Sequence, residues 1–147
     1  MEWVVIEPMV RWVRTLKMQT SVEVIGVSNA DATAEEWLQR FDLWGLFDHA
    51  LNSARVGVAK PDPAIYRMAF KYTASSPQTC LFIDDRDQNM PAAQHLGIRT
   101  VMYRGFDDFA HMIEEYFPGS VQCRHKPDIR VYQRRLAYER TSSLWRM

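Results

Sequence analysis

The sequence predicts an α/β domain in which a parallel sheet is flanked by helices. Short apolar segments alternate with segments of helical spacing, a pattern typical of parallel strands joined by helical crossovers. One apolar segment, at 80–83, runs directly into two adjacent carboxylates, Asp84 and Asp85. Its short, wholly apolar character indicates a strand covered on both faces. The carboxylates therefore lie at the end of a buried strand, where open α/β sheets bind ligands.

The first half of the chain supplies four expected elements. A helix begins at Pro8, which suits a first turn, and its apolar spacing continues to Leu16. A strand is expected at 22–27, a helix at 33–41 and a short strand at 49–53. The side chains expected to turn inward from the two helices are Met9, Val10, Trp12, Val13, Leu16, Ala34, Trp37, Leu38 and Phe41.

The second half continues the alternation. After a loop at 60–63 we expect a helix, the strand at 80–83, a helix from about 88 that stops at Gly97, a strand at 98–103 and a helix at 107–117. The side chains expected to turn inward from the first and last of these helices are Ile65, Met68, Ala69, Tyr72, Phe109, Met112, Ile113 and Tyr116.

Composition narrows the class of protein. The 147 residues suffice for one domain, and the 47% hydrophobic and 24% charged fractions are ordinary for a globular protein. The formal net charge of zero argues against broad attraction to nucleic acid or membranes. Neither a signal peptide nor an apolar run of membrane-spanning length is recognisable. With only Cys80 and Cys123, we expect no disulfide framework and a reducing, cytoplasmic location.

A change of character at Pro118-Gly119-Ser120 suggests a boundary between a core at 1–118 and a tail at 119–147. From Val121 onward the tail holds seven basic and two acidic side chains, a net charge of +5. One helix at about 128–139 is expected there. The tail is either a solvated appendage that packs one stripe on the core or an arm for nucleic acid or an acidic partner, and we favour the first alternative.

Polar side chains follow or precede three of these elements. Ser28 follows a strand, and its hydroxyl and the next backbone amides suit a phosphate group. Lys60 precedes two prolines that fix the local backbone, so its point charge is directed rather than free. Asp84 and Asp85 repel one another unless a cation such as Mg²⁺ or a proton compensates them. Each feature alone has an ordinary explanation as a cap, a solvated lysine or an acidic turn.

The order of these features resembles the haloacid dehalogenase-like (HAD) hydrolase superfamily. Receiver domains also combine paired acids, a hydroxyl and a lysine, but there the acidic pair comes first. Residues 26–29 resemble the second motif of the HAD superfamily, residues 56–66 the third and residues 82–98 the fourth. The resemblance covers about 8–116 and is greatest to the subgroup with small α-helical caps. It implies a Rossmann-like parallel sheet and descent from Mg²⁺-dependent phosphate-ester hydrolases.

The resemblance also implies roles for individual residues. Ser28 and Lys60 would bind the phosphate, and Asn29 would shape the loop. Asp85 would ligate Mg²⁺ directly, Asp84 would act through a metal-bound water, and Asn89 would support the acidic loop. The implied ligand is a small phosphorylated metabolite, and Mg²⁺ binding is expected to be weak or vestigial.

One departure from the family outweighs these matches. The first motif, Asp-x-Asp after the first strand, supplies the nucleophile, and this chain has no Asp before Asp31. The cap is also absent, so the chain resembles the C-terminal part of such an enzyme. The central first strand is therefore either missing or replaced by residues 3–6, which would leave Glu7 near the nucleophile position. In the other alternative, residues 1–7 simply lead into the helix.

Three hypotheses follow from this departure. The chain is a truncated phosphohydrolase that is inactive alone, a non-catalytic module that binds phosphate, Mg²⁺ or a partner, or one half of a split enzyme. A missing central strand exposes sheet edges, which favours homo-oligomers or association with a partner chain. We do not expect nucleic acid or membrane partners.

Overall fold

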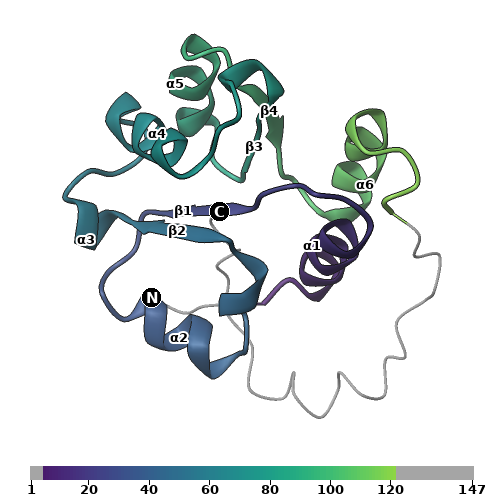
Figure 1. Cartoon of the computed structure of the whole chain (residues 1–147), viewed down its shortest axis with the longest axis horizontal. Coiled ribbons are helices and arrows are strands. Elements are labelled where there is room, and N and C mark those ends of the chain that lie inside the picture. The colour runs from purple at the N-terminus through teal and green to yellow at the C-terminus, as the bar shows by residue number, and fades with distance from the viewer. Residues whose placement is uncertain (1–4, 122–147) are drawn as a thin grey trace.

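A computed structural model describes residues 5–121 as helices alternating with short strands (Figure 1). The α-helices are α1 (Glu7–Gln19), α2 (Ala34–Arg40), α3 (Ser53–Val56), α4 (Pro63–Ala69), α5 (Met90–His95) and α6 (Phe106–Tyr116). The strands are β1 (Ile25–Ser28), β2 (His49–Asn52), β3 (Leu81–Asp84) and β4 (Arg99–Met102). Short 3-10 helices lie at Trp44–Leu46 (η1), Phe70–Tyr72 (η2), Pro77–Thr79 (η3) and Asp87–Asn89 (η4).

The strands form two separate parallel pairs. β1 pairs with β2, with Ser28 opposite Asn52, and β3 pairs with β4, with Asp84 opposite Met102. Within residues 5–121 no strand links the two pairs, and Figure 1 shows them apart. The α/β class and the parallel sheets are therefore as predicted, but the sheet is divided in two.

Helices cover both faces of these sheets. One apolar cluster joins α1 and α6 to β4, with Leu81 and Ile83 packed against it. A second cluster joins α4 and α5 to β1 and β2, with Phe82 packed against it. Alternate residues of β3 thus contact opposite layers, as expected for a strand buried on both faces.

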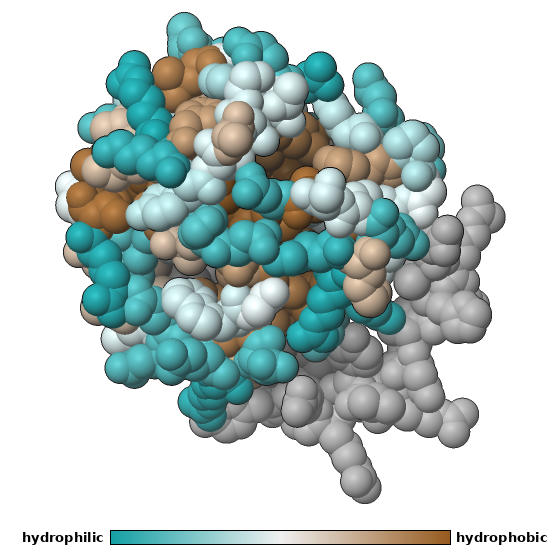
Figure 2. Space-filling model, viewed as in Figure 1, coloured by the Kyte–Doolittle hydropathy of each residue, from teal (hydrophilic) through white to brown (hydrophobic). Residues whose placement is uncertain are grey.

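A cavity of about 440 Å³ separates β1 from β3. On the face of the molecule drawn in Figure 2, hydrophobic surface is visible in recesses between hydrophilic side chains. This division is what the missing central strand predicts. Of the four residues considered as its replacement, Val5 and Ile6 pack instead against the α1–α6 cluster, and the other two lie outside the described residues.

The predicted elements are largely confirmed, with corrections at their ends and faces. The first strand begins at Ile25 rather than at residue 22, and Cys80 precedes β3 rather than belonging to it. All five apolar residues expected to face inward from α1 are buried. Three residues expected to be buried are instead exposed: Phe41, Tyr72 and Met112. Phe41 follows the end of α2 and Tyr72 lies in η2 after α4, so neither belongs to the α-helix whose spacing predicted it.

The boundary region retains contacts with the core. Ser120 is buried, and its hydroxyl accepts a hydrogen bond of 3.0 Å from the indole nitrogen of Trp12. The helix expected in the basic tail lies outside the described residues. Within residues 5–121 no helix is both long and apolar enough to cross a membrane.

Candidate phosphate-binding site

The carboxyl end of β1 places Ser28 and Asn29 beside the loop that precedes α4. Ser28 is half-buried, and its hydroxyl donates a long bond of 3.4 Å to the Leu51 carbonyl on β2. The Asn29 side chain binds the backbone of Lys60 at both polar groups. Its Nδ2 donates to the Lys60 carbonyl and its Oδ1 accepts from the Lys60 N–H, each at 2.7 Å. Asn29 therefore fixes the position of Lys60.

Lys60 forms a buried ion pair with Asp84 at the carboxyl end of β3. Its Nζ lies 2.7 Å from Asp84 Oδ2, and the two side chains are 1% and 0% exposed. The ammonium also lies 5.6 Å from the centre of the Phe82 ring, within cation–π range. A buried charge requires a partner of this kind, because the interior solvates an isolated ion poorly.

Asp84 is held at both of its oxygens. Oδ1 accepts from the Arg86 N–H at 2.9 Å and from Asn89 Nδ2 at 3.0 Å, while Oδ2 accepts from Lys60. Asn89 is 1% exposed, and its own Oδ1 accepts no hydrogen bond within the described residues. A buried carbonyl oxygen without a donor is uncommon and suits a bound water or a hydrated cation.

Tyr66 of α4 belongs to this network, although the sequence analysis gave it no role. Its hydroxyl donates to the Asn89 carbonyl at 2.8 Å, and its ring packs edge-on against Phe82 with centroids 5.2 Å apart. A buried phenol needs a hydrogen-bond acceptor. The signal in the sequence that could have identified Tyr66 is its position directly after Ile65, which was expected to face inward. Burial, together with the charge of Asp84, raises the pKa of Tyr66 to about 12.

This pKa gives a testable pH dependence. Tyr66 titrates at about 10 in the unfolded chain and at about 12 in the folded one. The folded state therefore favours the neutral phenol, and its contribution is complete below pH ~10 and is lost as pH rises through ~12. Urea unfolding across this range should show a fall in stability that Tyr66→Phe reduces. An unchanged fall in the variant would contradict the assignment.

A family model described as haloacid dehalogenase-like hydrolase matches residues 1–97. The chain belongs to this family. Among curated proteins, drimenol cyclase drtB of Aspergillus calidoustus is 32% identical over 109 residues, which are 72% of this chain and 21% of that protein. The sesquiterpene phosphatase astK of Aspergillus oryzae is 38% identical over 55 residues, 37% of this chain and 28% of the phosphatase. The HAD-like chain thus spans well under half of either protein.

Solved structures support the same fold. An uncharacterized protein of Corynebacterium glutamicum aligns with a TM-score of 0.65 at 23% identity, over 84% of this chain and 89% of that one. A HAD family enzyme of Bacteroides thetaiotaomicron, in complex with magnesium and inorganic phosphate, aligns with a TM-score of 0.59 at 26% identity. That alignment covers 67% of this chain and 54% of the enzyme.

The residues present in this HAD-like chain fit a hard cation. Between residues 84 and 89, at the end of β3, the chain supplies the carboxylates of Asp84 and the half-buried Asp85 and the Asn89 amide oxygen, which accepts no hydrogen bond within residues 5–121. Mg²⁺ binds through one or two carboxylates together with waters and phosphate oxygens. Asp84 already accepts three hydrogen bonds. No group of three or more His, Cys, Asp or Glu suited to a metal occurs in the described part.

The structure joins four of the six predicted site residues of this HAD-like chain in one hydrogen-bonded network, namely Asn29, Lys60, Asp84 and Asn89. Asp85 follows Asp84 directly, whereas the Ser28 hydroxyl bonds outside the network, to β2. The loop after Ser28 is fixed by residues that the sequence analysis did not select. Ser53 contacts both polar backbone groups of Ala30, and Asn52 donates to the Asp31 carbonyl at 2.9 Å.

Proposed function

We propose that this chain binds the phosphate group of a small phosphorylated metabolite at the carboxyl ends of β1 and β3, with Mg²⁺ as a weak co-ligand, and does not hydrolyse phosphate esters alone. The observation that carries the proposal is the buried ammonium of Lys60, which Asn29 and Asp84 hold at these strand ends. A fixed cation there suits an anionic ligand. The similarity to a sesquiterpene phosphatase supports phosphate chemistry.

Each group has a definite part in this binding. The Ser28 hydroxyl and the backbone amides that follow it would donate hydrogen bonds to the phosphate oxygens, and Lys60 would compensate their charge. Asp85, supported by Asp84 and Asn89, would hold Mg²⁺. When bound, the cation would neutralise charge between the acidic pair and the phosphate.

The proposed absence of turnover follows from the lack of the nucleophilic aspartate. Aspartyl-phosphate chemistry requires a carboxylate that attacks the phosphorus atom from a fixed position. Before Asp31 the carboxylates of this chain are Glu2, Glu7 and Glu23. Glu7 begins α1, and Glu23 lies before β1 and accepts from the Thr73 hydroxyl, at the opposite end of the strand from Ser28. Glu23 is therefore not positioned to attack a phosphate held at Ser28 and Lys60, and Glu7 belongs to a helix rather than to a strand end.

The proposal is tested by binding and turnover of the intact chain. Inorganic phosphate, titrated calorimetrically in the presence of Mg²⁺, should bind, and Ser28→Ala should weaken it about 10- to 100-fold, because a hydrogen bond to a charged group is worth about 1.5–3 kcal/mol. Ser76→Ala, which removes an exposed hydroxyl, is the matched control.

p-Nitrophenyl phosphate should not be hydrolysed above background by the isolated chain. Phosphate binding that is equal in Ser28→Ala and in the parent chain would place the anion elsewhere and overturn the site. Turnover by the isolated chain would overturn the non-catalytic assignment.

A further inference from the structure

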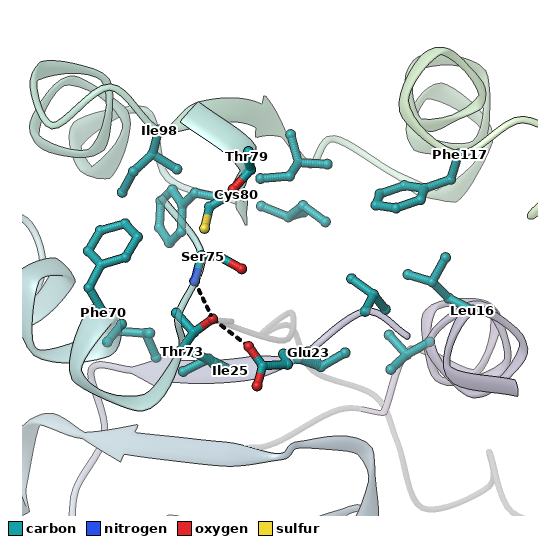
Figure 3. A pocket seen from close by; sticks show the side chains of 18 of the residues that line it. Leu16, Glu23, Ile25, Phe70, Thr73, Ser75, Thr79, Cys80, Ile98 and Phe117 are labelled. Carbon is teal, nitrogen blue, oxygen red and sulfur yellow. Dashed lines mark hydrogen bonds between the residues drawn. The ribbon is translucent and has the colours of Figure 1, made fainter. Parts of the chain in front are cut away.

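The cavity between β1 and β3 is lined by side chains from both layers of the fold (Figure 3). Its volume of about 440 Å³ lies within the range of small-molecule pockets, roughly 300–1,000 Å³. Trp12 and Leu16 of α1 line it together with Phe117, and Tyr66 and Phe70 line it from the side of α4. The cavity therefore has the size and the apolar walls of a ligand-binding site.

These walls favour a ligand with an apolar body. Water gains few hydrogen bonds from aromatic and aliphatic side chains, whereas an apolar group gains van der Waals contacts with them. Within the described residues β1 and β3 each pair on one side only, so backbone N–H and C=O groups also border the cavity. The body of the ligand therefore suits one polar linking group, such as an amide or a sulfonamide, in addition to its apolar surface.

One acidic side chain gives the cavity its charge. Among the described residues that line it, Glu23, which precedes β1, is the one that is charged near neutral pH. Burial, together with the charge of Glu23, raises the pKa of the Cys80 thiol, which therefore stays neutral there. The amino end of the cavity is thus negative.

A hydroxyl group orients the Glu23 carboxylate at the mouth of the cavity. Its Oε2 accepts a hydrogen bond from the Thr73 hydroxyl, which itself accepts from the Ser75 N–H at 3.1 Å (Figure 3). Glu23 lines the cavity and is also exposed, so it lies where a ligand enters. A carboxylate accepts about four hydrogen bonds, so the bond from Thr73 leaves room for a further donor.

We propose that this cavity binds a small amphipathic amine, with its apolar body between β1 and β3 and its ammonium group at Glu23. An ammonium donates charge-assisted hydrogen bonds to a carboxylate, and the Ser75 hydroxyl, which also lines the cavity, offers a further acceptor. An anionic ligand of the same shape is repelled by Glu23, and a neutral one lacks the attraction.

This amine site is distinct from the proposed phosphate site. Ser28, Lys60 and Asp84 are not among the described residues that line the cavity. Glu23 precedes β1 whereas Ser28 ends it, so the two sites lie at opposite ends of the strand. Their charges are opposite as well, because one site offers an ammonium and the other a carboxylate. Amine binding therefore does not depend on phosphate binding.

Dansylcadaverine is a suitable probe, because it joins an aromatic sulfonamide to an alkyl chain that ends in a protonated amine. Its fluorescence increases and shifts to the blue when the dansyl group leaves water, so titration with the intact chain measures binding directly. Two analogues test the charge: the N-acetyl derivative is neutral, and the matching dansylated amino acid carries a carboxylate in place of the ammonium. The neutral analogue should bind about three- to tenfold more weakly, a modest loss because Glu23 stays in contact with solvent, and the anion more weakly still.

Variants of the chain locate the bound amine. Glu23→Gln should weaken dansylcadaverine binding about three- to tenfold and remove the preference over the neutral analogue. Glu36→Gln, at an exposed position outside the cavity lining, is the matched control. Ala69→Phe fills the cavity and should weaken binding of the probe about tenfold or more, while Arg67→Phe on the exposed face of the same helix should not.

Circular dichroism establishes whether each variant is folded. If Ala69→Phe unfolds the chain, the comparison of Glu23→Gln with the parent chain still decides, because that change replaces an exposed carboxylate by an amide of the same shape. Ser28→Ala should leave the affinity for dansylcadaverine unchanged, so the amine site and the phosphate site can fail separately.

Four outcomes would overturn the proposal. No binding at millimolar dansylcadaverine would mean that the cavity is closed or filled in solution. Equal affinity for the amine and its neutral analogue, or of the parent chain and Glu23→Gln for the amine, would remove the role of the charge. Undiminished binding in folded Ala69→Phe would place the amine on the outer surface. Displacement of the probe by inorganic phosphate would place it in the phosphate site.

Discussion

Lys60→Met is expected to lower the free energy of unfolding by about 3–5 kcal/mol, the usual cost of removing one member of a buried ion pair. Methionine retains the length of the side chain, so the packing against Phe82 is largely kept. What is lost is the charge that compensates Asp84, whose side chain is 0% exposed. Urea denaturation followed by circular dichroism measures this loss directly.

A matched control and a double variant make the prediction specific. Lys71→Met replaces an exposed lysine and should change stability by less than about 0.5 kcal/mol. Combining Lys60→Met with Asp84→Leu should recover only part of the loss, because Arg86 N–H and Asn89 Nδ2 would still lack their acceptor. If Lys60→Met and Lys71→Met were equally stable, the ion pair would not contribute to the fold.

The ion pair has a second consequence, because it joins the two halves of the divided sheet. Asn29 follows β1, Lys60 precedes α4, and Asp84 ends β3. No backbone hydrogen bond links β1 to β3 within residues 5–121. The residues that the sequence suggested as a phosphate site are therefore also a structural link across the cavity. Binding of an anion there must compete with Asp84 for Lys60.

The sequence predicted the positions of these residues in the fold where the signal was local. The positions of Ser28 and Asp84 at strand ends followed from apolar runs that stop at polar residues. The buried face of α1 followed from its spacing, and the divided sheet from the missing first motif. The pairing of Lys60 with Asp84 was not predictable, because 24 residues separate them in the sequence and only the folded chain brings the two side chains together.

Faces of short or marginal helices were predicted less well. Phe41, Tyr72 and Met112 fit the helical period but lie at least 37% exposed, whereas Tyr66 is 2% exposed. Phe41 directly follows α2 and Tyr72 lies in η2 after the end of α4, so the α-helical spacing does not extend to either of them. Tyr66 is buried within α4, where its hydroxyl donates to the Asn89 carbonyl.

Phe109→Ala is expected to lower the free energy of unfolding by about 3–5 kcal/mol, the usual cost of truncating a fully buried phenylalanine. Phe109 is 0% exposed, and its ring packs edge-on against Trp12 with centroids 4.8 Å apart. It also lies 5.8 Å from the ring of Tyr103, which directly follows β4. Met112→Ala on the same helix is the control and should cost less than about 1 kcal/mol, because Met112 is 37% exposed.

The expected loss at Phe109 also tests how a divided sheet is held together. Trp12 belongs to α1, which leads into β1, and Tyr103 follows β4, so Phe109 connects the helix before one sheet pair to the segment after the other. With no hydrogen-bonded strand between the pairs, this apolar contact carries cohesion that backbone bonds supply in a continuous sheet. A loss at Phe109 no greater than that at Met112 would show that the two pairs unfold independently. A single cooperative transition with the larger loss would show that packing at Phe109 adds to the Lys60–Asp84 ion pair in coupling them.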